Sequence, residues 1–279
     1  ITDPAFASLG SWLEQLIAES SGKEGKGIVP IDGEPVVIPP ASEKDRLYVY
    51  VKYDGTKDGV VKQLRSVGHP VLVIDVACTK ELFAEFYRWE VAISYACMLL
   101  GVNTFDQPNV QLSKTLTKDY IKKYHEEGAL DLGEVLWENE KGAVYGQSFE
   151  GLAECENLKD VIAGFTALAG EGDYIAINAY LPRNEKMTEM MEGLRTAIAQ
   201  HTQRAVTLGF GPRFQHSTGQ LHKGGKNNIL VLYITADPEV DFEVPTQNMS
   251  FATLEMAQAL GDLNANFNVG RRGIRIHLK

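Results

Sequence analysis

Apolar and polar residues follow two recurring patterns along the chain, short β-rich runs and longer stretches with helical spacing. The runs predict strands at 46–53, 70–76, 173–181, 205–210, 228–236 and 273–278. The stretches between them predict helices at 6–20, 57–67, 80–100, 109–127, 157–168, 186–203 and 251–267. Strands that alternate with helices are typical of βαβ units, so the pattern predicts an α/β fold with a parallel sheet flanked by helices.

The periodicity lapses near the middle of the chain, and this lapse suggests how the chain is divided. Residues 131–150 alternate apolar and polar positions around a central Lys141-Gly142, which is typical of a hairpin or a surface excursion. We therefore expect an N-terminal subdomain at 1–130 and a C-terminal α/β subdomain at 151–279.

The most apolar stretch is 91–102, and it is too short to span a bilayer. Charged residues, among them Glu85 and Glu90, precede it closely. We expect a buried core helix and no membrane association.

Composition narrows the functional class. The chain has 279 residues, of which 44% are hydrophobic and 23% charged, which is ordinary for a globular protein. Its formal charge of −10 argues against a nucleic-acid binder, which needs clustered cations, but allows a small anionic substrate. The three cysteines share no metal-type or disulfide-type spacing, so we expect a cytoplasmic protein without metal.

The first helix carries a candidate acid/base pair. Gln15 and Glu19 are four residues apart, so they lie one above the other on a helix face that ends in Ser21-Gly22-Lys23. Alone, such a pair is also typical of a solvated helix edge.

Two unusual loop strings add further candidates. The first, NTFDQPNVQLSK at 103–114, ends at Lys114, which by itself would pass for an exposed helix lysine. The second, GFGPRFQHSTGQLHKGG at 209–225, follows an apolar strand, and open α/β sheets place ligands at that end of their strands. It contains His216 and His222, and an imidazole can exchange protons near neutral pH.

Together the three strings resemble the phosphoglucose isomerase family, which carries QxxxESxGK, FDQPxVxxxK and HSxGQ segments. Residue by residue, the resemblance places the catalytic base at Glu19, the lysine at Lys114 and the ring-opening histidine at His216, in preference to His222. Gln15, Ser217 and Gln220 fall on positions that would bind substrate. The resemblance covers essentially the whole chain and implies a sugar isomerase (SIS-type) fold.

The order of the segments refines the resemblance. Here Lys114 precedes His216, whereas ordinary isomerases place the histidine first. In this order, and in the closing string RRGIRIHL, the sequence is similar to the C-terminal part of bifunctional transaldolase/glucose-6-phosphate isomerases. We therefore expect the chain to belong to a longer protein, with the phosphate loop and the enediolate-stabilising arginine before Ile1.

The resemblance implies a function without metal or cofactor. It predicts interconversion of glucose 6-phosphate and fructose 6-phosphate through a cis-enediol, with a sugar phosphate as the small-molecule partner. Oligomeric state stays open. The alternative is a sugar-phosphate-binding or scaffolding domain that has the fold and lacks turnover.

Overall fold

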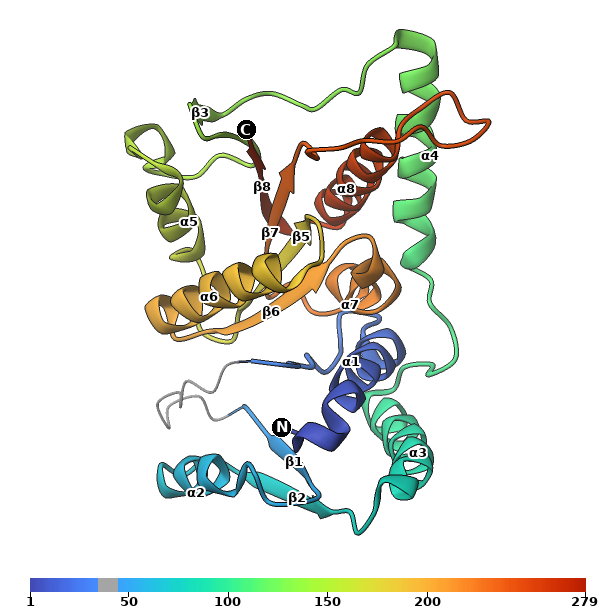
Figure 1. The fold of residues 1–279 in the computed structure, drawn as a ribbon, viewed down its shortest axis with the longest axis vertical. Helices are drawn as coiled ribbons and strands as arrows, with labels where there is room; N and C mark the ends of the chain where they lie inside the picture. The colour runs from blue at the N-terminus through green and yellow to red at the C-terminus, as the bar shows by residue number, and fades with distance from the viewer. Residues whose placement is uncertain (35–44) are drawn as a thin grey trace.

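The structure is a computed structural model that describes residues 1–34 and 45–279. Two sheets organise these residues (Figure 1). The smaller sheet pairs β1 (Tyr48–Lys52) with β2 (Val71–Asp75) in parallel, and Thr2 adds a parallel bridge to Val51. The larger sheet has six strands in the order β3-β4-β8-β7-β5-β6.

The larger sheet is mixed, which corrects the prediction of a parallel sheet. Its parallel part comprises β5 (Tyr174–Tyr180), β6 (Ala205–Phe210), β7 (Ile229–Ala236) and β8 (Arg272–Leu278). The strands β3 (Trp137–Asn139) and β4 (Gly142–Gly146) form an antiparallel hairpin, and β4 also pairs antiparallel with β8. The Asn139 side chain accepts hydrogen bonds from the backbone amides of Lys141 and Gly142 and so stabilises a tight turn. A connection this short can join two strands only in the antiparallel orientation.

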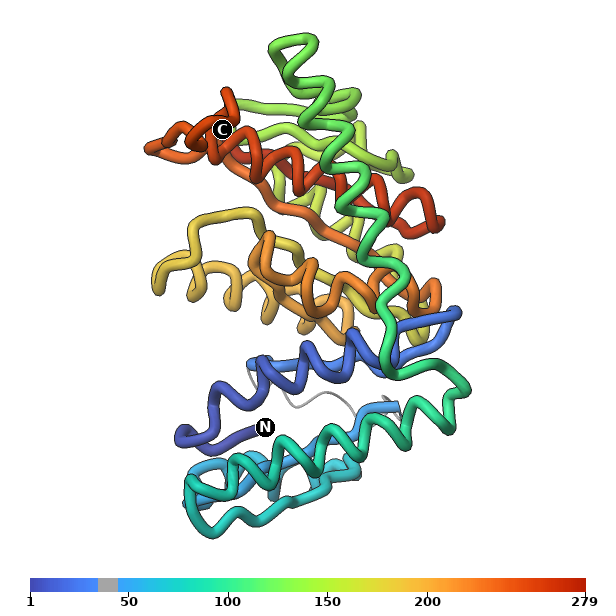
Figure 2. Tube along the Cα trace, turned by 90° about the vertical axis from the view of Figure 1, so that its right-hand side faces the viewer, coloured from blue at the N-terminus to red at the C-terminus, as the bar shows by residue number. Residues whose placement is uncertain are grey.

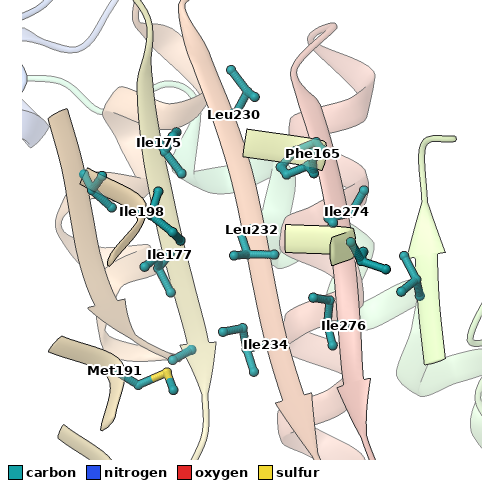
Figure 3. Packing of buried hydrophobic residues seen from close by; sticks show 14 of the residues in the cluster. Phe165, Ile175, Ile177, Met191, Ile198, Leu230, Leu232, Ile234, Ile274 and Ile276 are labelled. Atoms are coloured by element: carbon teal, nitrogen blue, oxygen red, sulfur yellow. The ribbon is translucent and has the colours of Figure 1, made fainter. Parts of the chain in front are cut away.

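Helices cover both faces of the larger sheet. On one face, α5 (Leu158–Thr166) and α6 (Glu185–Thr202) pack against alternate residues of the strands, including Ile175, Ile177 and Leu232 (Figure 3). On the other face, α8 (Phe251–Asn268) packs against the intervening residues, such as Tyr174 and Tyr233. This alternation is the period of two that a sheet buried on both faces requires.

Outside α8 lies α4 (Val110–Glu127), the helix that connects the two halves of the chain (Figure 1). The close approach depends on Gly261, because a Cβ at that position would lie 2.8 Å from the backbone nitrogen of Thr117. Glycine at this crossing therefore sets how near the helix that carries Lys114 lies to the sheet.

The N-terminal half forms a separate layer below the larger sheet (Figure 2). It contains α1 (Ala7–Ser21), α2 (Asp58–Ser66) and α3 (Leu82–Leu100), and the short turn η1 (Pro4–Phe6) precedes α1. Asp3 anchors this layer, because its buried carboxylate accepts hydrogen bonds from the Tyr50 hydroxyl and from four backbone amides, those of Tyr53, Asp54, Gly55 and Lys57.

The apolar stretch 91–102 was expected to be a buried core helix, and this expectation is wrong for the side of the helix that faces solvent. Ile93 and Cys97 are buried against α1, whereas Met98 and Leu99 are 64% and 83% exposed. The helix packs on one side only, so its apolar composition exceeds what the fold buries. Among the described residues, no helix is both long and apolar enough to cross a membrane.

Candidate active site

The three sequence strings meet around one buried side chain, Gln220. This residue lies in α7 (Thr218–Gly224), the short helix after His216, and its amide nitrogen donates to the Gly22 carbonyl at 2.8 Å. The same nitrogen donates to the Asn109 side chain at 2.9 Å, and the Gln220 carbonyl oxygen accepts from the Asn109 amide at 3.0 Å. One fully buried side chain therefore joins the end of α1, the start of α4 and α7.

A second contact joins the first string directly to the loop before α4. The Lys23 ammonium lies 3.1 Å from the Asp106 carboxylate and donates to the Asn103 carbonyl at 2.5 Å. Lys23 is only 2% exposed, and its hydrogen bond holds the pKa of Asp106 below the usual value. In Figure 2 α1 lies directly below α7, and the chain that leads into α4 passes beside both.

The candidate base and its neighbour lie on the same side of α1, as the spacing indicates. Gln15 is exposed, and its amide donates to Glu19 Oε2 at 3.3 Å. Glu19 is half-buried, a position from which a carboxylate can face both protein and solvent. The helix continues to Ser21 and Gly22, where the contact with Gln220 fixes its end.

Lys114 and His216 are both exposed. Lys114 projects from the first turns of α4, next to Ser113, which is buried and donates to Asp262 at 2.8 Å. His216 ends the short turn η4 (Arg213–His216), and the next residue, Ser217, is buried and donates to the Phe214 carbonyl. Within residues 1–34 and 45–279, no hydrogen bond or ion pair links the side chains of Glu19, Lys114 and His216 to one another.

His222 lies in a different environment from His216. It is 1% exposed, and neither of its ring nitrogens has a hydrogen-bond partner among the described residues. Burial lowers the pKa of His222 to about 3, and the neighbouring Lys223 acts in the same direction. The imidazole is therefore neutral at physiological pH, packed against Tyr174 and Phe214.

A buried ionic cluster joins α7 to α8 and β7. The Lys223 ammonium of α7 lies 2.8 Å from Asp262 Oδ1 of α8, with exposures of 1% and 0%. The other carboxylate oxygen accepts from the Tyr233 hydroxyl at 2.5 Å. Burial acts to raise the pKa of Asp262, but Lys223 and these hydrogen bonds outweigh it, so the pKa lies below its ordinary value.

The structure also shows a charged pocket that the sequence patterns did not indicate. It has a volume of about 100 Å³ and lies where α1 faces the carboxyl ends of β5 and β6. Glu14, one residue before Gln15, lines it together with Asp32, Arg213 and Ser217. The available signal was the spacing of Ser11, Glu14, Ala18 and Ser21, which places them along one side of α1.

Burial raises the pKa of Glu14 to about 7, and the nearby Asp32 carboxylate acts in the same direction. Arg213, Arg195 and the Ser217 hydroxyl oppose this shift. Glu14 therefore changes its charge close to neutral pH, which distinguishes it from an ordinary surface glutamate. No cluster of three or more histidine, cysteine, aspartate or glutamate side chains suited to a metal occurs within the described residues.

Comparisons with known proteins give one partial relationship. The chain is 30% identical over 149 residues to glucose-6-phosphate isomerase of Leptospira biflexa serovar Patoc, in both the Ames and the Paris strain. The match covers 39% of this chain and 33% of the relative, so it spans about a third of the length of the curated relatives. The chain is therefore distantly related to this isomerase over part of its length.

Two other comparisons do not identify a family or a fold for the chain. No family model matches the chain. A crystal structure of a hypothetical protein from Thermus thermophilus is 15% identical, with 96% of this chain and 70% of that chain covered, at a TM-score of 0.36. That score is too low for the likeness to inform the fold, and the SIS-type assignment stays a prediction.

Proposed function

We propose that the chain supplies part of an isomerase that interconverts glucose 6-phosphate and fructose 6-phosphate through a cis-enediol. The observation that carries the proposal is the junction at Gln220, through which the segments that resemble the isomerase strings are held together. The partial identity to a glucose-6-phosphate isomerase supports it. The transaldolase-fused arrangement stays a prediction, because the matched relatives do not address it.

Each candidate side chain has a distinct task in this proposal. Glu19, half-buried at the end of α1, acts as the general base that moves the proton between C2 and C1. His216 opens the sugar ring, and its exposure allows substrate contact that the buried His222 cannot make. Lys114 stabilises the oxygen that develops charge at the ring or at C1.

Gln15, Ser217 and Gln220 are the proposed substrate-binding residues, and their surroundings differ. Gln15 is exposed and able to contact a ligand, whereas the Gln220 amide is fully engaged by Gly22 and Asn109. A role for Gln220 in positioning the strings therefore has direct support in its contacts. A substrate contact of Gln220 or Ser217 stays a prediction.

The test is substitution in the protein that turns over hexose phosphate. Glu19→Gln keeps the shape and removes the base, so turnover should fall by at least about 100-fold while the substrate still binds. Glu90→Gln, an exposed glutamate on α3, is the matched control and should leave turnover unchanged. Exchange of solvent deuterium into C2 reports the proton transfer directly. If Glu19→Gln exchanges at the wild-type rate, Glu19 is not the base.

The other two roles have separate tests. His216→Ala should impair a closed-ring hexose phosphate far more than an open-chain substrate, whereas His125→Ala, at an exposed site on α4, should affect neither. Lys114→Met should lower turnover, and Lys118→Met, one turn further along the same helix, should not. Tight binding of a sugar phosphate without any turnover in the wild-type protein would instead support the binding-domain alternative.

A further inference from the structure

The charged pocket beside Glu14 is a site in its own right, outside the roles proposed for Glu19, Lys114 and His216. It lies at the carboxyl ends of the parallel strands β5 and β6, the edge at which open α/β sheets bind ligands. Its volume of about 100 Å³ exceeds the roughly 10–15 Å³ that a single water molecule needs. The pocket therefore has room for a small ligand of several atoms.

Two arginines at the pocket have guanidinium groups that the protein leaves available. Arg183 follows β5 and Arg213 begins η4; both are exposed, and neither forms an ion pair or a hydrogen bond with the described residues. The Arg183 guanidinium lies over the face of Phe210, 5.8 Å from the ring centre. A planar guanidinium suits oxyanions because it offers parallel N–H donors.

A third arginine of the pocket, Arg195, differs from these two because the protein already holds its guanidinium. The buried Arg195 guanidinium donates to the carbonyls of Val206 and Asp32 and also lies 3.4 Å from the Glu192 carboxylate. Arg195 lines the pocket, and each of its three guanidinium nitrogens already donates to the protein. Arg183 and Arg213 therefore offer a ligand more free donors than Arg195 does.

We propose that this pocket binds a small tetrahedral oxyanion, the sulfate or phosphate class, between Arg183 and Arg213. Glu14 lines the same pocket, and in its protonated form its carboxyl donates a hydrogen bond to the anion. The Asp32 carboxylate accepts a hydrogen bond from the Ser11 hydroxyl at 2.9 Å. When Glu14 is neutral, the three arginines outnumber Asp32 and Glu192, so the pocket carries net positive charge. Anion binding is thereby coupled to uptake of one proton.

The coupling fixes the direction of the pH dependence. The pKa of Glu14 is about 7, so its protonated fraction falls from about 0.9 at pH 6 to about 0.1 at pH 8. The charged groups that face Glu14 come from every neighbouring element, namely Asp32, Arg183, Glu192, Arg195 and Arg213. Burial also raises the pKa of Glu192, but from a value near 4.5, and Arg195 opposes that shift. Affinity should therefore be roughly tenfold higher at pH 6 than at pH 8.

The experiment is calorimetric titration of the full chain with sulfate, whose charge is constant over this pH range, at ionic strength held constant with chloride. Wild type should show saturable binding that weakens roughly tenfold from pH 6 to pH 8. Arg183→Met and Arg213→Met should each weaken binding at least about fivefold, whereas Lys186→Met, an exposed cation nearby on α6, should not. Acetate should bind more weakly than sulfate, because the site is proposed for a tetrahedral group.

The variant Glu14→Gln tests whether protonation of Glu14 causes the pH dependence of sulfate binding. The amide is neutral at every pH and can still donate, so sulfate should bind this variant with little dependence on pH. Persistence of the tenfold dependence in Glu14→Gln would overturn the role of Glu14. Absence of saturable binding, or equal binding by both arginine variants and wild type, would overturn the site itself. Turnover is not part of the readout, so these outcomes are independent of the proposed isomerase chemistry.

Discussion

The buried pair Lys223–Asp262 supports the sharpest prediction about stability, through the substitution Asp262→Asn. The two side chains are 1% and 0% exposed and 2.8 Å apart, and the carboxylate also accepts from Ser113 and Tyr233. Asparagine keeps the shape but leaves the Lys223 ammonium buried without a counter-charge. Removing one partner of a buried pair costs about 3–5 kcal/mol.

Urea and thermal unfolding at pH 7 would measure this loss. At about 2–4 °C per kcal/mol, the melting temperature should fall by roughly 10 °C. The matched control is Glu138→Gln, which breaks the ion pair with Lys279 on the surface, where the partners are 60% and 46% exposed; it should cost about 0–1 kcal/mol. An Asp262→Asn loss no larger than that of the control would refute the reasoning.

A double-mutant cycle and a pH series make the test specific to the pair. Lys223→Met combined with Asp262→Asn should be more stable than the sum of the single effects implies, by at least about 2 kcal/mol, because no uncompensated charge remains. The folded-state pKa of Asp262 is lowered, so its contribution is present above the unfolded-state pKa of 3.8 and is lost as pH falls through the folded-state value. Additive single effects would show that the two charges do not interact.

Two further substitutions test a buried carboxylate that accepts five hydrogen bonds and a buried imidazole that makes none with the described residues. Asp3→Asn should lower the free energy of unfolding by at least about 2 kcal/mol in urea titrations, because the carboxylate accepts five hydrogen bonds, and a loss below about 0.5 kcal/mol would contradict this. His222→Leu should stay within about 1 kcal/mol of wild type, since the buried ring has no hydrogen bond to lose among the described residues; a cost above about 3 kcal/mol would point to an unseen partner.

Much of the secondary structure was accessible from the sequence, because the periodic segments are long. The thirteen strands and helices predicted from apolar spacing lie within about two residues of those observed, β6 coinciding at 205–210. The mixed character of the larger sheet was missed, because a short hairpin does not reveal whether it joins a neighbouring sheet. The short helix α7 was also missed, since it contains two glycines and every one of its residues is buried by tertiary contacts.

The candidate site was accessible only in part, for a related reason. The strings that contain Glu19, Lys114 and His216 were visible as motifs, but spacing could not show that Gln220 and Lys23 join them. Glu14 could not be predicted as a site residue, because the sequence alone does not distinguish it from a solvent-exposed helix glutamate. Its raised pKa results from burial between segments distant in sequence and from Asp32.

Each of the three candidate side chains lies close to a buried anchor, and this arrangement explains how an exposed group can be held precisely. Ser113 bonds to Asp262 and leaves Lys114 exposed; Ser217 bonds to the Phe214 carbonyl and leaves His216 exposed. Gly22 is held by Gln220 just beyond Glu19. A side chain keeps a defined position when its own backbone is fixed by packing and hydrogen bonds. Substitution of Asp262 should therefore displace Lys114 through Ser113, although Asp262 itself does not contact the ligand. Activity would then fall because Lys114 is misplaced, and not because a reacting group has been removed.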